Sequence, residues 1–283
     1  MSPDPFTVMG VVNVTPDSFS DGGRYLSAAA AIRHGQELEA QGAAILDIGG
    51  ESTRPGAAPV AAAEERERVV PVIEGLLAAG VRARISVDTS KAVVAAAALQ
   101  AGASIVNDVT ALRGDPEMAA LIAERGAEVC LMHMLGEPRT MQRDPRYADV
   151  VGEVGAFLCE RVAAAAVAGI ASERIMIDPG IGFGKTAAHN LELLARLEEI
   201  SALGPAVVIG TSRKSFIGAI TGREVDGRLA GTIATNVIAL QRGASVFRVH
   251  DVGPVREALQ VAAATVSARW PPASPMSPTG STS

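Results

Sequence analysis

Aromatic residues are scarce in this chain of 283 residues, because Phe, Trp and Tyr together make up only 3% of it. Large rings therefore cannot form most of the core, which must be filled by the short side chains of Ala, Val, Ile and Leu. Hydrophobic residues still reach 48%, enough for a sizeable core in one large domain or two small ones. Short branched side chains suit the packed interior of a small parallel barrel.

Paired cysteines, basic clusters and long apolar runs are also missing. The two cysteines, Cys130 and Cys159, form no CxxC motif, as expected of a reduced cytoplasmic protein. The net charge is −6 without any basic block, which argues against binding to nucleic acid. No uncharged apolar run approaches the ~18 residues of a membrane span, and no signal-peptide pattern opens the sequence. We expect neither nucleic acid nor a membrane as a partner.

Short β-branched and apolar runs alternate with Ala- and Leu-rich helical patterns along the chain. The expected strands cover residues 8–13, 44–48, 84–87, 104–107, 128–132, 174–178, 206–209 and 245–249. The expected helices cover residues 27–41, 62–78, 90–100, 116–124, 147–168, 190–200, 228–241 and 252–268. Eight strand–helix units predict a single α/β domain, a (β/α)8 TIM barrel over residues 1–269. A doubly wound sheet is the alternative, although it usually has fewer and longer strands.

Three connections are longer than a barrel needs, and they are rich in Gly, Pro, Ser and Arg. They cover residues 15–26, 49–61 and 135–146, and the first two follow the first and second strands. Long loops at the ligand face of a barrel are usually lids or substrate clamps, and surface decoration is the alternative. The tail 270–283 is rich in Pro and Ser and is expected to be disordered.

Polar motifs follow the first, second, third and sixth expected strands. They read NVTPDSFSDGG, DIGGESTRPG, SVDTS and IDPGIGFGK. In a parallel barrel the carboxyl ends of the strands form the ligand-binding mouth. Asp88, Asn107 and Asp178 fall at the ends of the third, fourth and sixth strands, so we expect their side chains to meet there. Two carboxylates and an amide suit a flat heterocycle with several N–H donors, whereas helix capping is the alternative for the aspartates.

Groups suited to anions and to a metal gather at the first and last strands. Arg248 and His250 end the eighth strand, beside the first in a closed barrel, where they can clamp phosphates. Asn13 ends the first strand and offers an amide oxygen, a hard ligand suited to Mg²⁺. Ser212 lies where a helix is expected to begin after the seventh strand, and such an N-terminus suits a carboxylate. A simple N-cap is the alternative for Ser212.

The same motifs, with AGASIVNDV, LMHM, GTSRKSFIG and FRVHDV, follow one another in an order that resembles the dihydropteroate synthases over residues 8–266. The resemblance implies a transferase of folate biosynthesis with a TIM-barrel fold. Such an enzyme joins 4-aminobenzoate to 6-hydroxymethyl-7,8-dihydropterin diphosphate, giving 7,8-dihydropteroate and diphosphate. The resemblance also implies Mg²⁺ as cofactor, a homodimer, and inhibition by sulfonamides.

The resemblance further implies roles for individual residues. The implied pterin pocket contains Asp88, Asn107, Met132, Asp178, Phe183, Gly210, Lys214 and Arg248. The implied 4-aminobenzoate site contains Phe19, Thr53, Arg54, Pro55 and Ser212. The diphosphate is assigned to Asn13, Arg54, Arg248 and His250, with Asn13 also the metal ligand. The implied catalytic residues are Asp88, Lys214 and Arg248. For Met132 and Phe183, ordinary core packing is an equal alternative.

The chemistry of these substrates favours an SN1-like substitution. An aryl amine is a weak nucleophile, diphosphate is a good leaving group, and the pterin ring can delocalise positive charge. Asp88 is expected to stabilise the resulting cation as a preorganised anion, without a covalent enzyme intermediate. The alternatives are a methyltetrahydrofolate-dependent methyltransferase and a paralogue that only binds pterin. The two N-terminal loops and the SRK and RVHD motifs argue against the first, and the intact motif positions argue against the second.

Overall fold

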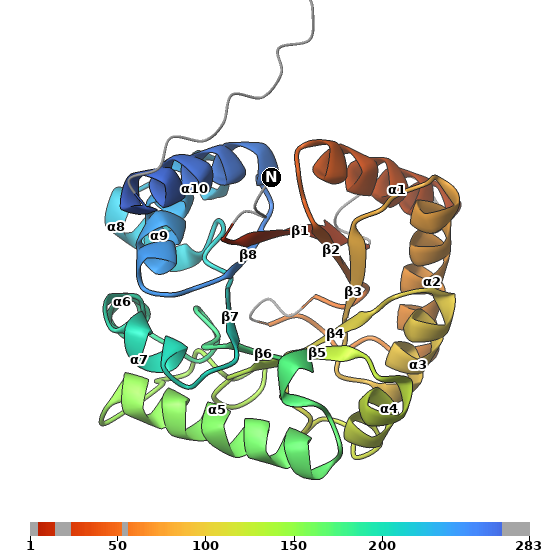
Figure 1. Ribbon diagram of the computed structural model, residues 1–283, viewed down its shortest axis with the longest axis horizontal. Coiled ribbons are helices and arrows are strands. Elements are labelled where there is room, and N and C mark those ends of the chain that lie inside the picture. Colours follow the sequence, from red (N-terminus) through yellow and green to blue (C-terminus); the bar gives the residue numbers. More distant parts are fainter. Residues whose placement is uncertain (1–4, 15–23, 53–55, 268–283) are drawn as a thin grey trace, which may run out of the picture.

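Eight parallel strands form an inner ring in a computed structural model that describes residues 5–14, 24–52 and 56–267 (Figure 1). The strands are β1 (Thr7–Asn13), β2 (Ile45–Gly49), β3 (Arg84–Asp88), β4 (Ile105–Asp108), β5 (Glu128–Met132), β6 (Ile175–Asp178), β7 (Ala206–Ile209) and β8 (Val246–Val249). They pair in chain order, and β1 also pairs with β8, which closes the barrel. The TIM-barrel prediction is confirmed, and the doubly wound alternative is wrong.

Helices form an outer ring around the strands (Figure 1). They are α1 (Arg24–Ala40), α2 (Ala62–Ala78), α3 (Ala92–Ala101), α4 (Met118–Arg125), α5 (Val150–Val167), α6 (Ala187–Ala195), α7 (Leu197–Ser201), α8 (Ser215–Thr221), α9 (Leu229–Gln241) and α10 (Val252–Ser267). None of the helices in the described ranges is long and apolar enough to cross a membrane.

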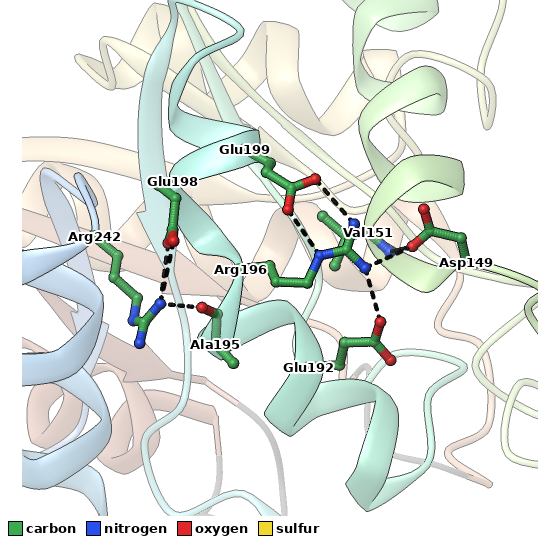
Figure 2. Close-up of polar contacts among 8 residues, drawn as sticks. All are labelled: Asp149, Val151, Glu192, Ala195, Arg196, Glu198, Glu199 and Arg242. Carbon is green, nitrogen blue, oxygen red and sulfur yellow. Dashed lines mark hydrogen bonds and ion pairs between the residues drawn. The ribbon is translucent and has the colours of Figure 1, made fainter.

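The expected helix over residues 190–200 is divided into α6 and α7. The division lies at Arg196, whose φ of −118° and ψ of 28° are not helical. Its guanidinium contacts Asp149, Glu192 and Glu199 at 2.8–3.0 Å (Figure 2). Asp149 is itself the N-cap of α5, because Oδ1 accepts the Val151 N–H at 3.2 Å. Arg196 therefore ties the junction of α6 and α7 to the start of α5.

Alternation along the strands sorts the buried side chains into two sets. One set faces the helices, as Val8 and Val12 of β1 do, in a large apolar cluster. The other set fills the barrel and consists of Met9, Ile45, Ile105, Cys130, Met176, Val208 and Val246. We call this second set the barrel floor. Cys130 is a buried free cysteine in it.

Positions two residues beyond the barrel floor face the same side of each strand, one layer nearer the carboxyl ends. They are Val11, Asp47, Asn107, Met132, Asp178, Gly210 and Arg248. We call this layer the polar layer, since it holds most of the polar groups. Strand periodicity alone thus places charged groups directly above an apolar floor.

Strand register brings the first four strands into one row, which meets the polar layer at Asn107. Asn13 pairs with Gly49, Gly49 with Asp88, and Asp88 with Asn107. Gly49 leaves space in the row, because a Cβ atom placed there would lie 3.8 Å from both Asn13 Oδ1 and Asp88 Oδ2. The amide of Asn13 and the carboxylate of Asp88 therefore flank the same small gap.

Candidate active site

An arginine held between two carboxylates forms the centre of the polar layer. Arg248 Nε donates to Asp47 Oδ2 at 2.6 Å, and Nη2 donates to Asp88 Oδ2 at 2.9 Å. Asp47 is fully buried and also accepts from Ser86 Oγ at 2.6 Å and from Asn107 Nδ2 at 3.1 Å. Charge-assisted bonds of this kind are strong and directional. The network fixes Arg248 and joins β2, β3, β4 and β8 across the barrel.

Burial controls the charge states in this network. It raises the pKa of Asp88 to about 7, a change that Arg248 opposes and Asp47 reinforces. Burial acts to lower the pKa of Arg248, but the two aspartates together raise it, so the guanidinium stays charged. Asp88 therefore ionises in the neutral range, as groups in active sites often do.

Asp178 ends β6, on the far side of the barrel mouth from β2. Its Oδ1 accepts the backbone N–H of Gly180 at 2.7 Å, which orients the carboxylate. Burial raises the pKa of Asp178, whereas the Gly180 N–H and the cations Lys214, Arg248 and Lys185 lower it. The mouth thus has a buried carboxylate on each side, Asp88 and Asp178, and both can accept hydrogen bonds from N–H groups of a ligand.

An apolar wall with a cation at its edge lies beside Asp178. Lys214 Nζ is 4.2 Å from the centroid of the Phe183 ring, a cation–π contact. Phe183 packs against a small cluster made of Val109, Met132, Met134 and Met141. Burial lowers the pKa of Lys214 to about 8, and Arg248 contributes to the decrease. A flat ring can lie against this wall while Lys214 donates to its edge.

Ser212 and His250 contact each other between the ends of β7 and β8. Ser212 Oγ accepts the backbone N–H of His250 at 3.2 Å and lies 3.0 Å from its Nδ1. Burial lowers the pKa of His250 to about 4, helped by Arg248, so its imidazole is neutral under physiological conditions. The predicted position of Ser212 at a helix start is wrong, because α8 begins only at Ser215. Ser212 is instead held in a turn by His250.

The structure brings most of the predicted site residues to one mouth of the barrel. These are Asn13, Asp88, Asn107, Met132, Asp178, Phe183, Gly210, Ser212, Lys214, Arg248 and His250. Phe19, Thr53, Arg54 and Pro55 lie outside the described residues, so their roles stay predictions. Within the described ranges, no group of three or more His, Cys, Asp or Glu side chains could hold a metal ion.

Sequence reasoning gave no role to Asp47, although it is central to the polar network. The signal was present in the alternation of β2, because Ile45, Asp47 and Gly49 share one face of the strand. Ile45 belongs to the barrel floor, so the next position on that face had to point into the mouth. A carboxylate there needs partners, and Arg248 and Asn107 supply them.

Sequence reasoning also missed a partly buried ion cluster near Asp88. Lys91 Nζ contacts carboxylate oxygens of both Glu51 and Glu65. Glu65 is fully buried in α2, and its Oε1 has no hydrogen-bond partner among the described residues. Its charge helps to raise the pKa of Asp88. No local sequence pattern brings these three residues together, since they lie on three different elements.

Comparisons with known proteins agree with this arrangement. The family described as "Pterin binding enzyme" matches residues 9–250. The dihydropteroate synthase of Escherichia coli (strain K12) is 48% identical over 262 residues, which covers 93% of this chain and 92% of that protein. This chain belongs to the dihydropteroate synthase family. The Mycobacterium leprae (strain TN) member is 46% identical over 276 residues, covering 95% of this chain and 96% of that protein.

Solved structures of the family have the same fold. Xanthomonas albilineans dihydropteroate synthase with 4-aminobenzoic acid is 50% identical, with a TM-score of 0.87 over 92% of this chain and 93% of that chain. The same enzyme in complex with 7,8-dihydropteroate is 46% identical, with a TM-score of 0.84 over 94% and 96% of the two chains. Yersinia pestis dihydropteroate synthase in a sulfonamide drug complex is 44% identical, with a TM-score of 0.87 over 92% and 94%.

Proposed function

We propose that this member of the family condenses 6-hydroxymethyl-7,8-dihydropterin diphosphate with 4-aminobenzoate. The products are 7,8-dihydropteroate and diphosphate. The observation that carries the proposal is the pairing of a polar layer with an apolar wall at one barrel mouth. Asp88 and Asp178 face a common space, and Arg248 and Lys214 supply positive charge. Family membership over nearly the whole chain supports the same reaction.

The pterin ring is placed against the wall formed by Met132 and Phe183. Its 2-amino-pyrimidinone edge carries N–H groups that can donate hydrogen bonds to Asp178. The side-chain amide of Asn107 adds a further hydrogen-bonding group. Lys214 donates to a ring oxygen or nitrogen. A dry carboxylate is a strong acceptor for such donors, which accounts for an aspartate at this position despite the cost of burying it.

The diphosphate is placed next to Arg248 and His250. Arg248 supplies the charge, whereas His250 reaches the phosphates as a neutral donor because its pKa is low. Asn13 would hold Mg²⁺ through its amide oxygen. The donor set fits this ion, since Mg²⁺ usually takes one or two protein oxygens and completes its shell with water and phosphate. When bound, Mg²⁺ supplies positive charge that makes diphosphate a better leaving group.

The reaction is an SN1-like substitution at the exocyclic carbon of the pterin. The carbon–oxygen bond breaks, and its electron pair leaves with diphosphate. The resulting cation is delocalised over the ring and stabilised by the Asp88 carboxylate, which Arg248 and the surrounding network hold in place. The amine of 4-aminobenzoate then attacks and releases a proton to solvent. Ionised Asp88 is the active form.

The second substrate is placed at Ser212, in the turn that follows β7 beside the pterin pocket. Ser212 can donate to the carboxylate of 4-aminobenzoate. Phe19, Thr53, Arg54 and Pro55 are proposed to enclose its ring, on the strength of the motif resemblance. A sulfonamide is proposed to occupy the same place, since it resembles 4-aminobenzoate, and the Yersinia pestis enzyme has been solved in a sulfonamide drug complex.

Product analysis tests the proposed reaction against its alternatives. Incubation with both substrates and Mg²⁺ should yield 7,8-dihydropteroate, identified by its mass. A pterin-dependent methyltransferase would instead move the methyl group of methyltetrahydrofolate to a corrinoid acceptor. A binding-only paralogue would bind a pterin analogue and form neither product. Pterin binding without 7,8-dihydropteroate would therefore contradict the proposal.

Homodimer formation and a cytoplasmic location complete the proposed function. Two packed helices, α9 and α10, leave apolar side chains exposed, with Ile238 at 41%, Val261 at 68% and Val266 at 64% exposure. Such a patch suits a contact between two copies. Light scattering of the wild type and of Val261→Glu tests it, and a monomeric wild type would contradict it. Both cysteines are free, which suits a reducing compartment.

A further inference from the structure

Lysine is almost absent from this chain, and its three positions all lie near the barrel mouth. Of 25 Lys and Arg residues only Lys91, Lys185 and Lys214 are lysines. They follow β3, β6 and β7 respectively. Lysine and arginine are not interchangeable, because the lysine amine is compact and its pKa shifts readily on burial.

Lys185 is the lysine whose purpose the proposed reaction leaves open. It is only 3% exposed, at the end of the loop between β6 and α6. Its Nζ donates to the Phe183 carbonyl at 3.0 Å and lies 2.9 Å from His133 Nδ1. Burial and the charge of Lys185 lower the pKa of His133 to about 3, so that imidazole is neutral and can accept the bond. One side-chain amine thus joins the loop to the end of β5.

The loop after β6 is pressed tightly against the end of β5. Gly180 and Gly184 have positive φ values of 68° and 63°. A Cβ atom at Gly180 would lie 1.9 Å from the His133 carbonyl oxygen, and one at Gly184 would lie 2.6 Å from the Leu135 carbonyl oxygen. Tyr147 also donates to the Gly184 carbonyl, at 2.9 Å. Lys185 therefore adds side-chain hydrogen bonds where the backbone of the loop already packs against the end of β5.

This contact bears directly on the proposed pterin pocket. Phe183, whose carbonyl Lys185 holds, carries the ring against which Lys214 Nζ lies. Asp178 and Gly180 precede it in the same loop, and their hydrogen bond orients the Asp178 carboxylate. A small rotation of the loop would move both the apolar wall and the acceptor of the pterin edge.

Stability alone does not explain a buried lysine here. Burial lowers the pKa of Lys185 to about 7, and Lys214 contributes, whereas the charge of Asp178 opposes the change. Its two hydrogen-bond acceptors, the Phe183 carbonyl and His133 Nδ1, are neutral. Burying a lysine on neutral partners is costly, and a methionine of similar length would fill the space without that cost. A cost of this kind is commonly found at functional sites.

We propose that Lys185 is a positioning residue for the pterin pocket, whose side-chain amine fastens the loop after β6 to the end of β5 and so fixes Phe183 and Asp178. The proposal rests on the pterin chemistry proposed above. Lys185 does not touch the substrate. It acts through the two residues that do.

Steady-state kinetics of Lys185→Met in the full chain provide the test, with Arg196→Met as the matched control. Arg196 is a cation that also joins separate elements (Figure 2), but its side chain is 37% exposed and lies among the outer helices. In Lys185→Met we expect the KM for pterin diphosphate to rise about tenfold or more, as for loss of one charge-assisted contact. The KM for 4-aminobenzoate should change little, and the melting temperature should hold or rise. Arg196→Met should leave both KM values unchanged.

A double-mutant cycle with Phe183→Ala separates positioning from a general effect. If Lys185 acts through Phe183, adding Lys185→Met to Phe183→Ala should weaken pterin binding much less than it does in the wild type. The proposal is overturned if Lys185→Met keeps the wild-type KM for pterin diphosphate, or if it only lowers the melting temperature. Full additivity in the cycle would also overturn it. A wild type that neither binds pterin nor forms product would instead reject the proposed function itself.

Discussion

At the scale of single residues, burial shapes the chemistry of the mouth more strongly than pairing does. Asp88 contacts Arg248 at 2.9 Å, yet its pKa is raised to about 7, because the loss of hydration outweighs the attraction of the guanidinium. Lys214 is affected in the opposite sense, and its pKa falls to about 8 for the same reason. Both groups therefore titrate close to the working pH of an enzyme.

The pH dependence of kcat/KM for pterin diphosphate should be bell-shaped. Activity should rise as Asp88 loses its proton, with an apparent pKa of about 7. It should fall again as Lys214 loses its own proton, with an apparent pKa of about 8. This ratio reports groups of the free enzyme, and both values belong to the coupled network. A value of kcat/KM that stays constant from well below pH 7 up to the range between the two pKa values would count against this assignment.

Asp88→Asn should keep the shape of the side chain but remove its charge. Losing one preorganised electrostatic contact typically lowers the rate by a factor of about 10²–10³. Binding of a pterin analogue should suffer less than kcat does, because the anion is needed mainly for the cationic intermediate. The acid limb of the pH profile should also disappear. Near-normal turnover in this variant would remove Asp88 from the mechanism.

Ser212→Ala should weaken the binding of 4-aminobenzoate and the binding of a sulfonamide by a similar factor. The hydroxyl is proposed to contact the region that the two ligands share, and one hydrogen bond to a charged group is worth roughly 1.5–3 kcal/mol at most. The substrate KM and the drug Ki should be measured on the same variant. Pro55→Ser is the comparison variant, because it should weaken the binding of the bulkier drug more than the binding of the substrate. Drug-selective loss in Ser212→Ala would show that the shared contact lies elsewhere.

At the scale of elements, strands were easier to predict than the turns that follow them. Each strand is a short run whose alternation and length are visible locally, so Asp88, Asn107 and Asp178 could be placed at the mouth from sequence. The break at Arg196 could not, because contacts with Asp149 on α5 accompany it and that residue is distant in sequence. The ion cluster of Lys91 was hidden for the same reason.

The turns at the mouth also carried less local information than the strands. The sequence around Ser212 is typical of a helix start, but the helix begins three residues later and Ser212 contacts His250 instead. The partner lies on β8, so only the closed barrel brings it near. Likewise Lys185 ends a motif that was recognised, yet its contact with His133 depends on the packing of two neighbouring loops.

Gly180→Ala should destabilise the fold far more than Gly204→Ala. Both glycines have positive φ, 68° and 107° respectively, so both substitutions strain the backbone, and Gly204 lies farther from the left-handed region at about +57°. A Cβ atom at Gly180 would also meet the His133 carbonyl oxygen, whereas nothing lies within 4 Å at Gly204. Urea denaturation of the two variants measures the difference. Equal losses would mean that the loop after β6 is not packed against β5 as described.

At the scale of the whole molecule, the layers of the barrel set an order for the substrates. Gly210 lies in the polar layer, and Ser212 lies two residues further along the chain, in the turn beyond the end of β7. The pterin pocket is therefore the inner site and the proposed 4-aminobenzoate site the outer one. A ligand bound in the outer layer would obstruct entry to the inner one.

Ordered binding should follow from this arrangement. Calorimetry with 4-aminobenzoate alone should show weak binding, and the affinity should increase once pterin diphosphate or a pterin analogue with diphosphate and Mg²⁺ is present. The bound pterin supplies part of the surface against which the second substrate lies. Tight binding of 4-aminobenzoate to the free protein would contradict this order.

Diphosphate release, followed with each substrate omitted in turn, tests the central claim most directly. With both substrates and Mg²⁺ present, the account predicts diphosphate and 7,8-dihydropteroate in equal amounts. Omitting 4-aminobenzoate should reduce release to a small fraction, and omitting pterin diphosphate should abolish it. Release at the same rate without 4-aminobenzoate, or no release with both substrates present, would contradict the conclusion that this barrel joins the two molecules.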